Sequence, residues 1–228
     1  MFTALAALVA CDAGLLALDQ PAGPPGSTLR HLLAHASGLA PSERRALAKP
    51  GRRRIYSNSG YEVAAEKVAR ATGIPFADYL HQAIIEPLGL DLRLEGSPAF
   101  ALSGTIDDIA GFACELLQPK LVSAATMREA TSVQFPGLSG VVPGYGRKKR
   151  NDWGLGFAIR GSEPPHWTGE RNSPRTFGHI GGGGGILWVD PEAELALTSL
   201  SGREFGAWAK EAWPRLSDAV LVDYAAMR

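Results

Sequence analysis

The stretch FGHIGGGGGILWVDP, residues 177–191, decides the fold class, because it places five glycines directly before a strand-like run. Ordering glycine costs more backbone entropy than ordering any other residue, so the run needs a structural reason. A phosphate-binding loop would need Gly-Lys-Ser/Thr and a following helix, and neither is present. A flexible linker would not continue straight into a hairpin. We therefore expect the glycines to lie in a strand region. Because they have no side chains, a substrate can lie directly against the edge of that strand.

Strands surround the glycines, and helices precede them. ILWVD and LALTSL flank the turn at 190–193, which is typical of a β-hairpin, and the alternating apolar residues of 153–159 predict another strand. Residues 134–152 are rich in Gly, Pro, Lys and Arg and predict a long surface loop. Helical spacing predicts helices that begin near residues 1, 28, 59, 75, 105 and 123, and one over 204–227 interrupted at Pro214.

Helices first and antiparallel strands later favour an α+β fold with helices packed on a sheet. No linker divides the chain, so we predict a single domain over residues 1–228 with a mostly helical portion around 27–150.

Capping signals mark several helix starts. Ser27 is expected to cap the helix near 28, Ser59 and Glu62 form a capping-box pattern, and Thr105 and Ser123 begin two further helices. The first helix is different, because nothing capable of capping precedes its apolar residues. This helix therefore looks as if its first residues are the interior of a longer element.

Charge and composition exclude several classes of protein. Lys+Arg and Asp+Glu number 23 each, so no global field attracts nucleic acid or anionic lipid. The basic runs 52–54 and 147–150 lack interleaved aromatic residues and are interpreted as solvated loops. Cys11 and Cys114 lie outside any metal-ligand spacing and are expected to be free thiols.

The N-terminal stretch MFTALAALVAC resembles a lipoprotein signal superficially, but no Lys or Arg precedes its apolar residues. A globular helix and a cytoplasmic location are therefore favoured, and no run reaches the ~18 apolar residues of a membrane span.

Two groups of residues are candidates for chemistry. Tyr56 and Asn58 stand directly before a predicted helix, whose N-terminus offers unpaired N–H groups. A tyrosine there can have its pKa lowered or relay a proton, whereas the alternative is a turn with Asn58 bonded locally and Tyr56 half-buried. His31 and His35 have the i, i+4 spacing of a metal pair, but no third ligand is nearby, so packing or surface roles are favoured.

Three stretches together resemble the serine β-lactamase and penicillin-binding protein family, in its class C-like branch with D,D-peptidases and esterases. They are STLRHLLAHASGL at 27–39, YSNSGY at 56–61 and HIGGGGG at 179–185 before the WVDP hairpin. The stretch from 3 to 21 is similar to the family's helix just after its nucleophile. The resemblance implies a β-lactamase/transpeptidase-like fold.

The resemblance also implies roles for individual residues. Tyr56 matches the tyrosine that serves as general base or proton relay, and Asn58 matches the asparagine that hydrogen-bonds the substrate amide. His179 and Gly181 occupy the Lys-Thr-Gly position, and the Gly182 N–H is expected to form one arm of an oxyanion hole. The implied reaction is acyl transfer to water through a serine ester, on a β-lactam, a D-alanyl peptide or a small ester. No metal or organic cofactor is implied, and no oligomeric state.

One departure from the family pattern is severe. The family's Ser-x-x-Lys motif, which supplies the nucleophile, stands directly before the helix that begins here at Met1, and no such motif occupies a matching position. We expect an N-terminally truncated chain that lacks the nucleophile and the N-terminal strands of the sheet, and that is inactive as it stands. The alternative is a non-catalytic ligand-binding module of the same fold.

Overall fold

Strand β7 (Ile186–Asp190) is the centre of the main sheet, and all of its residues are buried. It pairs antiparallel with β6 (Phe177–Ile180) on one side and with β8 (Leu195–Ser199) on the other. β5 (Ala158–Ile159) extends the sheet beyond β6, in the order β5-β6-β7-β8. The computed structural model, which describes residues 1–227, thus contains the predicted antiparallel sheet and the β7–β8 hairpin.

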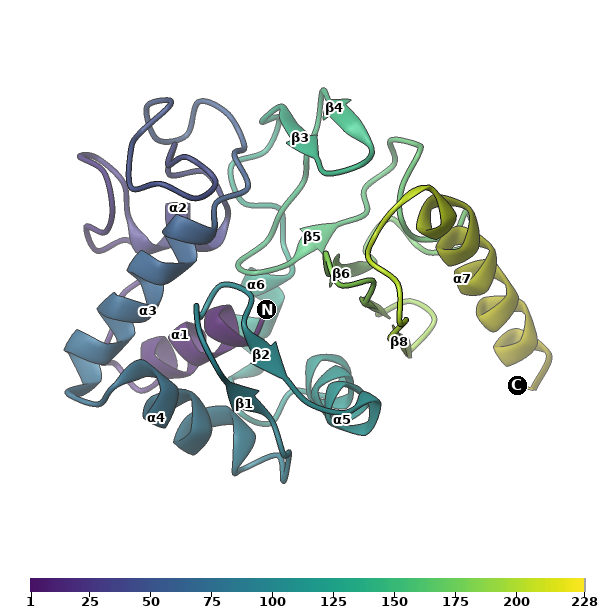
Figure 1. Cartoon of the computed structure of the whole chain (residues 1–228), viewed down its shortest axis with the longest axis horizontal. Helices are drawn as coiled ribbons and strands as arrows, with labels where there is room; N and C mark the ends of the chain where they lie inside the picture. The colour runs from purple at the N-terminus through teal and green to yellow at the C-terminus, as the bar shows by residue number, and fades with distance from the viewer. Residues whose placement is uncertain (228) are drawn as a thin grey trace.

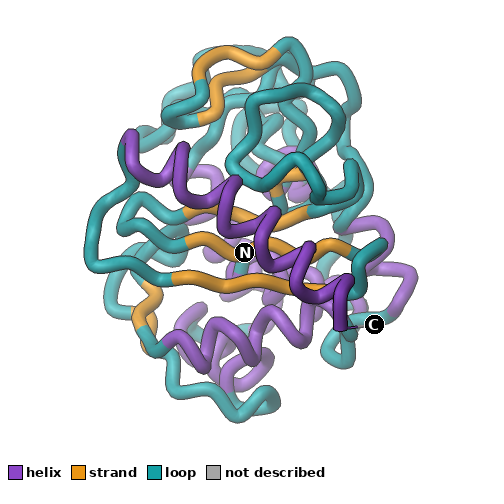
Figure 2. Tube along the Cα trace, turned by 90° about the vertical axis from the view of Figure 1, so that its right-hand side faces the viewer, coloured by secondary structure: helices purple, strands orange, loops and turns teal. Residues whose placement is uncertain are grey.

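The sheet is covered on both faces, because successive side chains of a strand point to opposite sides. Ile186 and Trp188 pack in the smaller core with helix α7 (Ala207–Met227), whereas Leu187 and Val189 belong to the larger core built by the other helices. Figure 2 shows α7 crossing one face of the strands, with the remaining helices on the far side and below. The molecule is therefore a layered α+β structure, as the sequence predicted.

Helix α7 is anchored to the sheet by a buried hydrogen bond. The Trp188 indole N–H donates to Ser217 Oγ at 3.0 Å, and Trp213 of the same helix is 2% exposed. The helix continues through Pro214, so the predicted interruption there is wrong.

Helix α1 (Phe2–Asp12) runs through the middle of the larger core (Figure 1). Most of its residues are buried, which is expected of a helix that is apolar all round. It packs against α3 (Asn58–Thr72), and its small side chains allow close approach. A Cβ at Gly156 would lie 2.2 Å from the Ala4 Cβ, so this contact requires glycine. Met1 is the N-cap residue of α1, and no side chain caps this helix N-terminus, as the sequence predicted.

The other elements surround this core. They are α2 (Leu29–Leu33), α4 (Phe76–Leu80) continued by the π-helical turn η1 (His81–Ile85), α5 (Ile106–Leu117), α6 (Ala124–Ala130), and the hairpins β1–β2 (Arg93–Leu94, Leu102–Ser103) and β3–β4 (Gly140–Val142, Gly146–Lys148). Among residues 1–227, no helix combines the length and the apolarity that crossing a membrane requires.

The capping predictions were partly right. Thr105 and Ser123 cap α5 and α6 as expected. The cap of α2 is Thr28 rather than Ser27, because the Thr28 side chain accepts from the third N–H of the helix. The cap of α3 is Ser57 rather than Ser59, since Ser57 Oγ accepts a backbone N–H of the first turn while Ser59 is already inside the helix.

The strand predicted at 153–159 is mostly a turn. Only Ala158 and Ile159 pair with β6, and the chain folds back before them, where the Gly154 N–H donates to the Phe157 carbonyl at 2.9 Å. The left-handed φ of +102° at Gly156 ends the alternation that the apolar residues suggested.

The two basic runs are not simply solvated. Within 52–54, Arg54 is 2% exposed and donates to four backbone carbonyls, those of Ala34, Gln134, Phe135 and Asn151. Within 147–150, Lys148 is 9% exposed, and its Nζ donates to the Pro165 carbonyl at 2.6 Å. The predicted surface loop 134–152 contains the β3–β4 hairpin, and these buried cations fasten the segment to the rest of the chain.

The glycine run forms the turn between β6 and β7, not a continuous strand. The Gly181 N–H donates to the Gly185 carbonyl at 2.8 Å, and the Gly184 N–H donates to the Gly181 carbonyl at 3.0 Å. Gly184 has a φ of +88°, and a Cβ there would lie 1.9 Å from the Arg203 carbonyl oxygen. Nothing lies within 4 Å of a Cβ at Gly183. The backbone therefore requires glycine at position 184 but not at position 183.

We expect Gly184→Ala to lower the free energy of unfolding by roughly 1–3 kcal/mol, because it combines left-handed strain with a steric clash. Gly183→Ala is the matched control and should change it by less than about 0.5 kcal/mol. Urea denaturation followed by tryptophan fluorescence measures both. Equal effects of the two substitutions would contradict this account of the turn.

Candidate active site

The segment before α3 is fixed by its N-cap. Ser57 Oγ accepts the Gly60 N–H at 3.0 Å and donates to the Ala40 carbonyl at 2.7 Å. Ser57 is fully buried, whereas its neighbours Tyr56 and Asn58 are half-buried and line a large cavity. The cap therefore holds one residue inward and presents the two flanking side chains to the cavity.

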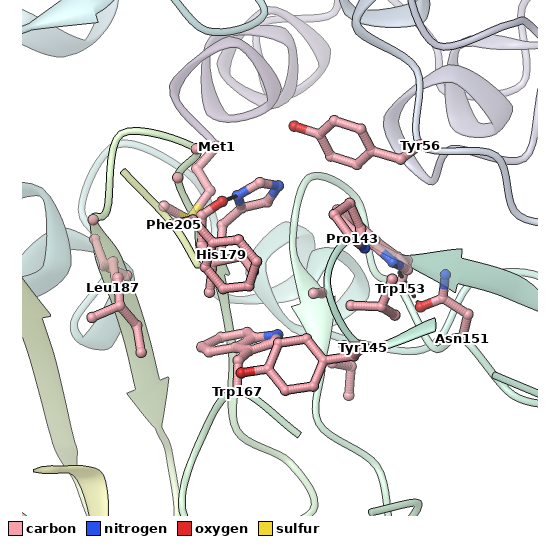
Figure 3. A pocket seen from close by; sticks show the side chains of 18 of the residues that line it. Met1, Tyr56, Pro143, Tyr145, Asn151, Trp153, Trp167, His179, Leu187 and Phe205 are labelled. Atoms are coloured by element: carbon pink, nitrogen blue, oxygen red, sulfur yellow. Dashed lines mark hydrogen bonds between the residues drawn. The ribbon is translucent and has the colours of Figure 1, made fainter. Parts of the chain in front are cut away.

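Residues distant in sequence meet around Tyr56. Its ring centroid lies 5.6 Å from that of His179, 6.0 Å from that of Trp153 and 4.4 Å from that of His35. We call these four residues the aromatic cluster. In Figure 3 the phenol of Tyr56 and the imidazole of His179 extend toward the same space. The family resemblance implies that Tyr56 and His179 belong to one site, and the structure brings their two rings together.

The large cavity has a volume of about 800 Å³. All five predicted site residues line it: Tyr56, Asn58, His179, Gly181 and Gly182. The two glycines sit in the β6–β7 turn, where both are exposed. The structure thus brings the whole predicted set together, while the chemical role of each residue stays a prediction.

The surroundings of Tyr56 decide between its two predicted roles. Burial raises the pKa of the Tyr56 phenol above its ordinary value, so the lowered pKa considered from the sequence is wrong. A protonated phenol can still relay a proton, and this alternative remains.

His179 is an uncharged imidazole at neutral pH. Burial lowers its pKa to about 4, and its Nδ1 lies 2.5 Å from the Ile180 carbonyl oxygen. The carbonyl can only accept, so the proton is assigned to Nδ1 and Nε2 is left as an acceptor. His179 therefore offers the cavity a neutral hydrogen-bonding ring.

His35 is a site residue that the sequence analysis considered only as a possible metal partner of His31. It is 3% exposed, has a φ of +54°, and its Nδ1 accepts the Ser57 N–H at 3.0 Å. Burial lowers its pKa well below the ordinary value, so the ring is neutral and acts as an acceptor. Because it joins the backbone beside Tyr56 and packs against the Tyr56 ring, it positions that side chain.

His31 and His35 each have a hydrogen-bond partner within the protein. His31 Nδ1 lies 2.8 Å from Thr28 Oγ1 in the cap of α2, and its ring lies 4.3 Å from that of Phe135. Residues 1–227 contain no group of three or more His, Cys, Asp or Glu side chains that could hold a metal ion. The packing role that the sequence favoured is the observed one.

Trp153 is the second member of the cluster that the sequence missed. Its indole N–H donates to Asn151 Oδ1 at 3.2 Å, which fixes the ring. The ring meets those of His35 and His179 edge-on, with centroids at 4.6 and 5.6 Å. Its apolar spacing suggested only a strand residue, and no local pattern identifies these long-range contacts.

Comparison with known proteins finds a matching family model and similar solved structures. A family model described as Beta-lactamase matches residues 1–221. A solved beta-lactamase from Mycobacterium bovis is 58% identical, with 98% of this chain and 84% of that chain covered and a TM-score of 0.96. No curated protein matches the sequence.

Two more distant structures share the fold. The octameric penicillin-binding protein homologue from Pyrococcus abyssi is 21% identical, with 97% of this chain and 64% of that chain covered and a TM-score of 0.72. Simvastatin synthase from Aspergillus terreus is 19% identical, with 99% and 81% covered and a TM-score of 0.80. At these identities the likeness concerns the fold alone.

We expect His35→Leu to lower the free energy of unfolding by roughly 2–4 kcal/mol. The change leaves the buried Ser57 N–H without an acceptor and places a branched side chain at a left-handed φ. His81→Leu, at an exposed histidine, is the control and should stay within about 0.5 kcal/mol of the unsubstituted protein. Urea denaturation decides the matter, and a loss below 1 kcal/mol for His35→Leu would contradict the positioning role.

Stability is expected to fall as the pH drops below about 6.5. The folded-state pKa values of His179 and His166 are lowered by burial to about 4 and about 3, so the unfolded chain binds protons that the folded chain does not. Each such histidine contributes stability that is complete above the unfolded-state pKa and is lost at roughly 1.4 kcal/mol per pH unit below it.

Urea denaturation between pH 7.5 and pH 5 measures this slope. His179→Asn should reduce the slope by about one proton, whereas the exposed control His81→Asn should keep it. A flat pH profile, or the same slope after His179→Asn, would contradict the buried neutral state of His179.

Proposed function

The chain belongs to the beta-lactamase family, and from this premise we propose that the large cavity is the acyl site of a serine acyl hydrolase. Its substrate classes are a β-lactam, a D-alanyl peptide or a small ester. The observation that carries the proposal is the convergence of Tyr56, Asn58 and the 179–182 segment on one cavity. The continuous core from α1 to β7 also supports one domain over residues 1–228.

The N-terminal end of α1 opens into the same space. Met1 and Phe2 line the large cavity, and a second cavity of about 90 Å³ lies between them, His35, Tyr56 and His179. A Ser-x-x-Lys turn ahead of α1 would place its hydroxyl at a helix N-terminus, where unpaired N–H groups and the dipole favour developing negative charge. The 228 residues contain no Ser-x-x-Lys, so this polypeptide by itself lacks such a nucleophile.

The proposed reaction has two halves. The serine oxygen forms a bond to the acyl carbon, the bond from that carbon to the leaving atom breaks, and the serine proton passes through the Tyr56 hydroxyl to the leaving atom. Water then forms a bond to the acyl carbon, the ester bond to serine breaks, and a proton of that water passes through the Tyr56 hydroxyl to the serine oxygen. The Asn58 amide hydrogen-bonds the substrate, and the Gly182 N–H donates to the carbonyl oxygen as charge develops on it.

A second candidate is a non-catalytic binding module that keeps the cavity and performs no chemistry. The cavity and its lining residues support this candidate as well as the hydrolase. The two candidates differ in what an added nucleophile does.

We expect the 228-residue polypeptide to form no covalent adduct with a chromogenic cephalosporin or a nitrophenyl ester. Loss of the serine costs a hydrolase on the order of 10⁶ in turnover. The same polypeptide extended at its N-terminus by a Ser-x-x-Lys turn should form an acyl-enzyme and hydrolyse the ester. Intact-mass spectrometry and release of nitrophenolate measure the two effects.

Tyr56→Phe in the extended protein should slow hydrolysis by roughly 10² or more, because a positioned proton-transfer group is lost. Tyr224→Phe on α7, which does not line the cavity, is the matched control and should leave the rate unchanged. An extended, folded protein that stays inert toward all three substrate classes would support the binding module. An adduct on the 228-residue polypeptide would overturn the assignment of the nucleophile.

A further inference from the structure

The large cavity carries an excess of positive side chains. Lys148, Arg150 and Arg160 line it, together with the carboxylates of Asp152 and Glu163. In the part of the chain that the structure describes, none of these three cations forms an ion pair. The arginines that do form ion pairs lie outside the cavity: Arg30, Arg44, Arg45, Arg70 and Arg93. Three cations against two carboxylates leave one positive charge unbalanced.

Lys148 is held at the cavity by a neutral partner. It is 9% exposed, and its Nζ donates to the Pro165 carbonyl at 2.6 Å. A carbonyl oxygen orients the ammonium group but leaves its charge in place. Burial lowers the pKa of this ammonium, and the negative charge of Glu163 opposes the shift without cancelling it. An anion in the cavity would supply the charge partner that Lys148 lacks.

Arg160 is held in the same way. Its Nε donates to the Gly169 carbonyl at 3.2 Å, and its Nη1 donates to the Gly161 carbonyl at 3.1 Å. Nη2 has no acceptor among residues 1–227, so part of the guanidinium fork is unpaired. The planar fork of an arginine matches the two oxygens of a carboxylate.

His166 adds a neutral donor between these two cations. Lys148 and Arg160 bind the carbonyls at the two ends of the segment 165–169, which contains His166. Burial lowers the pKa of His166 to about 3, and the nearby charges of Arg160 and Lys148 lower it further. Its Nδ1 accepts the Thr168 N–H at 3.2 Å, so the neutral ring carries its proton on Nε2. His166 lines the cavity as the two cations do.

These three groups lie away from the proposed acyl position. Figure 3 shows Tyr56 at one side of the cavity and Trp167, from the segment just described, at the opposite side. The Arg160 N–H donates to the Thr176 carbonyl at 2.8 Å, three residues before His179. Three residues of extended chain span about 10 Å. A ligand that reaches both ends of the cavity must have about this length.

The two carboxylates of the cavity are associated with other cations. The charges of Arg54 and Arg150 act on Asp152, where they oppose the rise in pKa that burial causes. Glu163 is half-buried, and its Oε2 accepts the Arg150 N–H at 3.5 Å. The excess of one positive charge suits a singly charged carboxylate better than a doubly charged phosphate.

We propose that Lys148, Arg160 and His166 form a subsite for the carboxylate of a ligand, at the end of the cavity remote from Tyr56. Nζ, Nη2 and Nε2 are the donors, and two of them carry positive charge. Joined to the proposed function, on which this second step rests, the subsite selects acyl compounds whose carboxylate lies about 10 Å from the reacting carbonyl. β-Lactams and D-alanyl peptides differ from this class, because their carboxylate lies within a few bonds of the scissile bond.

Two esters that differ by one charge test the subsite on the 228-residue polypeptide without a catalytic step. Monomethyl suberate has an ester and a carboxylate at the ends of its chain, roughly 9 Å apart when extended. Dimethyl suberate has no charge and one more methyl group, so apolar burial alone would favour it. Isothermal titration calorimetry at pH 7.5 and low ionic strength should show the monoester binding at least roughly tenfold more tightly.

Three variants place the effect at the subsite. Glu163→Gln removes a neighbouring negative charge and should tighten binding of the monoester by roughly twofold or more, a gain that loss of folding cannot produce. Arg160→Gln should weaken it by roughly fivefold or more. Arg175→Gln removes the same charge from an exposed arginine outside the cavity and should stay within about twofold. Dimethyl suberate should respond to none of the three.

Equal binding of the two esters, tighter binding of the diester, or no binding of either would overturn the proposal. Equal losses from Arg160→Gln and Arg175→Gln would overturn it as well. If Arg160→Gln fails to fold, the ester pair and Glu163→Gln still decide. If the Ser-x-x-Lys-extended protein stays inert while the monoester keeps its advantage, the hydrolase is refuted and the subsite stands. If that protein hydrolyses nitrophenyl esters while the two suberates bind alike, the subsite is refuted and the hydrolase stands.

Discussion

The arrangement of the cavity depends on one buried hydrogen bond, from the Ser57 N–H to His35 Nδ1. It joins the end of the α2 segment to the start of α3, and it requires a histidine that is neutral and held at a left-handed φ. Around this ring pack Tyr56, Tyr61 and Trp153, with centroid distances of 4.4, 4.9 and 4.6 Å. Three separate parts of the chain therefore contact one another at the His35 ring, next to the cavity wall.

The electrostatic character of the site follows from the same burial. Removing water disfavours charge, so Tyr56 stays protonated and His179 stays unprotonated near neutral pH. The buried cations Arg54 and Lys148 give their donors to backbone carbonyls and hold loops together. Around Tyr56 and His179 the cavity therefore acts through uncharged hydrogen-bonding groups, which suits proton relay.

The family resemblance implied the meeting of Tyr56 with the strand of His179. Local signals in the sequence predicted the α+β class, the β7–β8 hairpin, and the caps of α5 and α6. These features depend on periodicity, turn chemistry and motifs that lie within a few residues. The turn at 181–185, the burial of Arg54 and the place of Trp153 were not predictable in this way. Each is decided by a partner distant in sequence, such as the Arg203 carbonyl that excludes a side chain at Gly184.

The central claim is that Tyr56, His179 and Gly182 surround one acyl-binding position. A crystal structure of the Ser-x-x-Lys-extended protein after reaction with an alkyl phosphonate tests it most directly. The account predicts a phosphoryl oxygen at hydrogen-bond distance, about 2.7–3.2 Å, from the Gly182 N–H, and an alkyl chain against Trp167. An adduct whose alkyl chain lies outside the large cavity, or whose phosphoryl oxygen faces away from the β6–β7 turn, would contradict it.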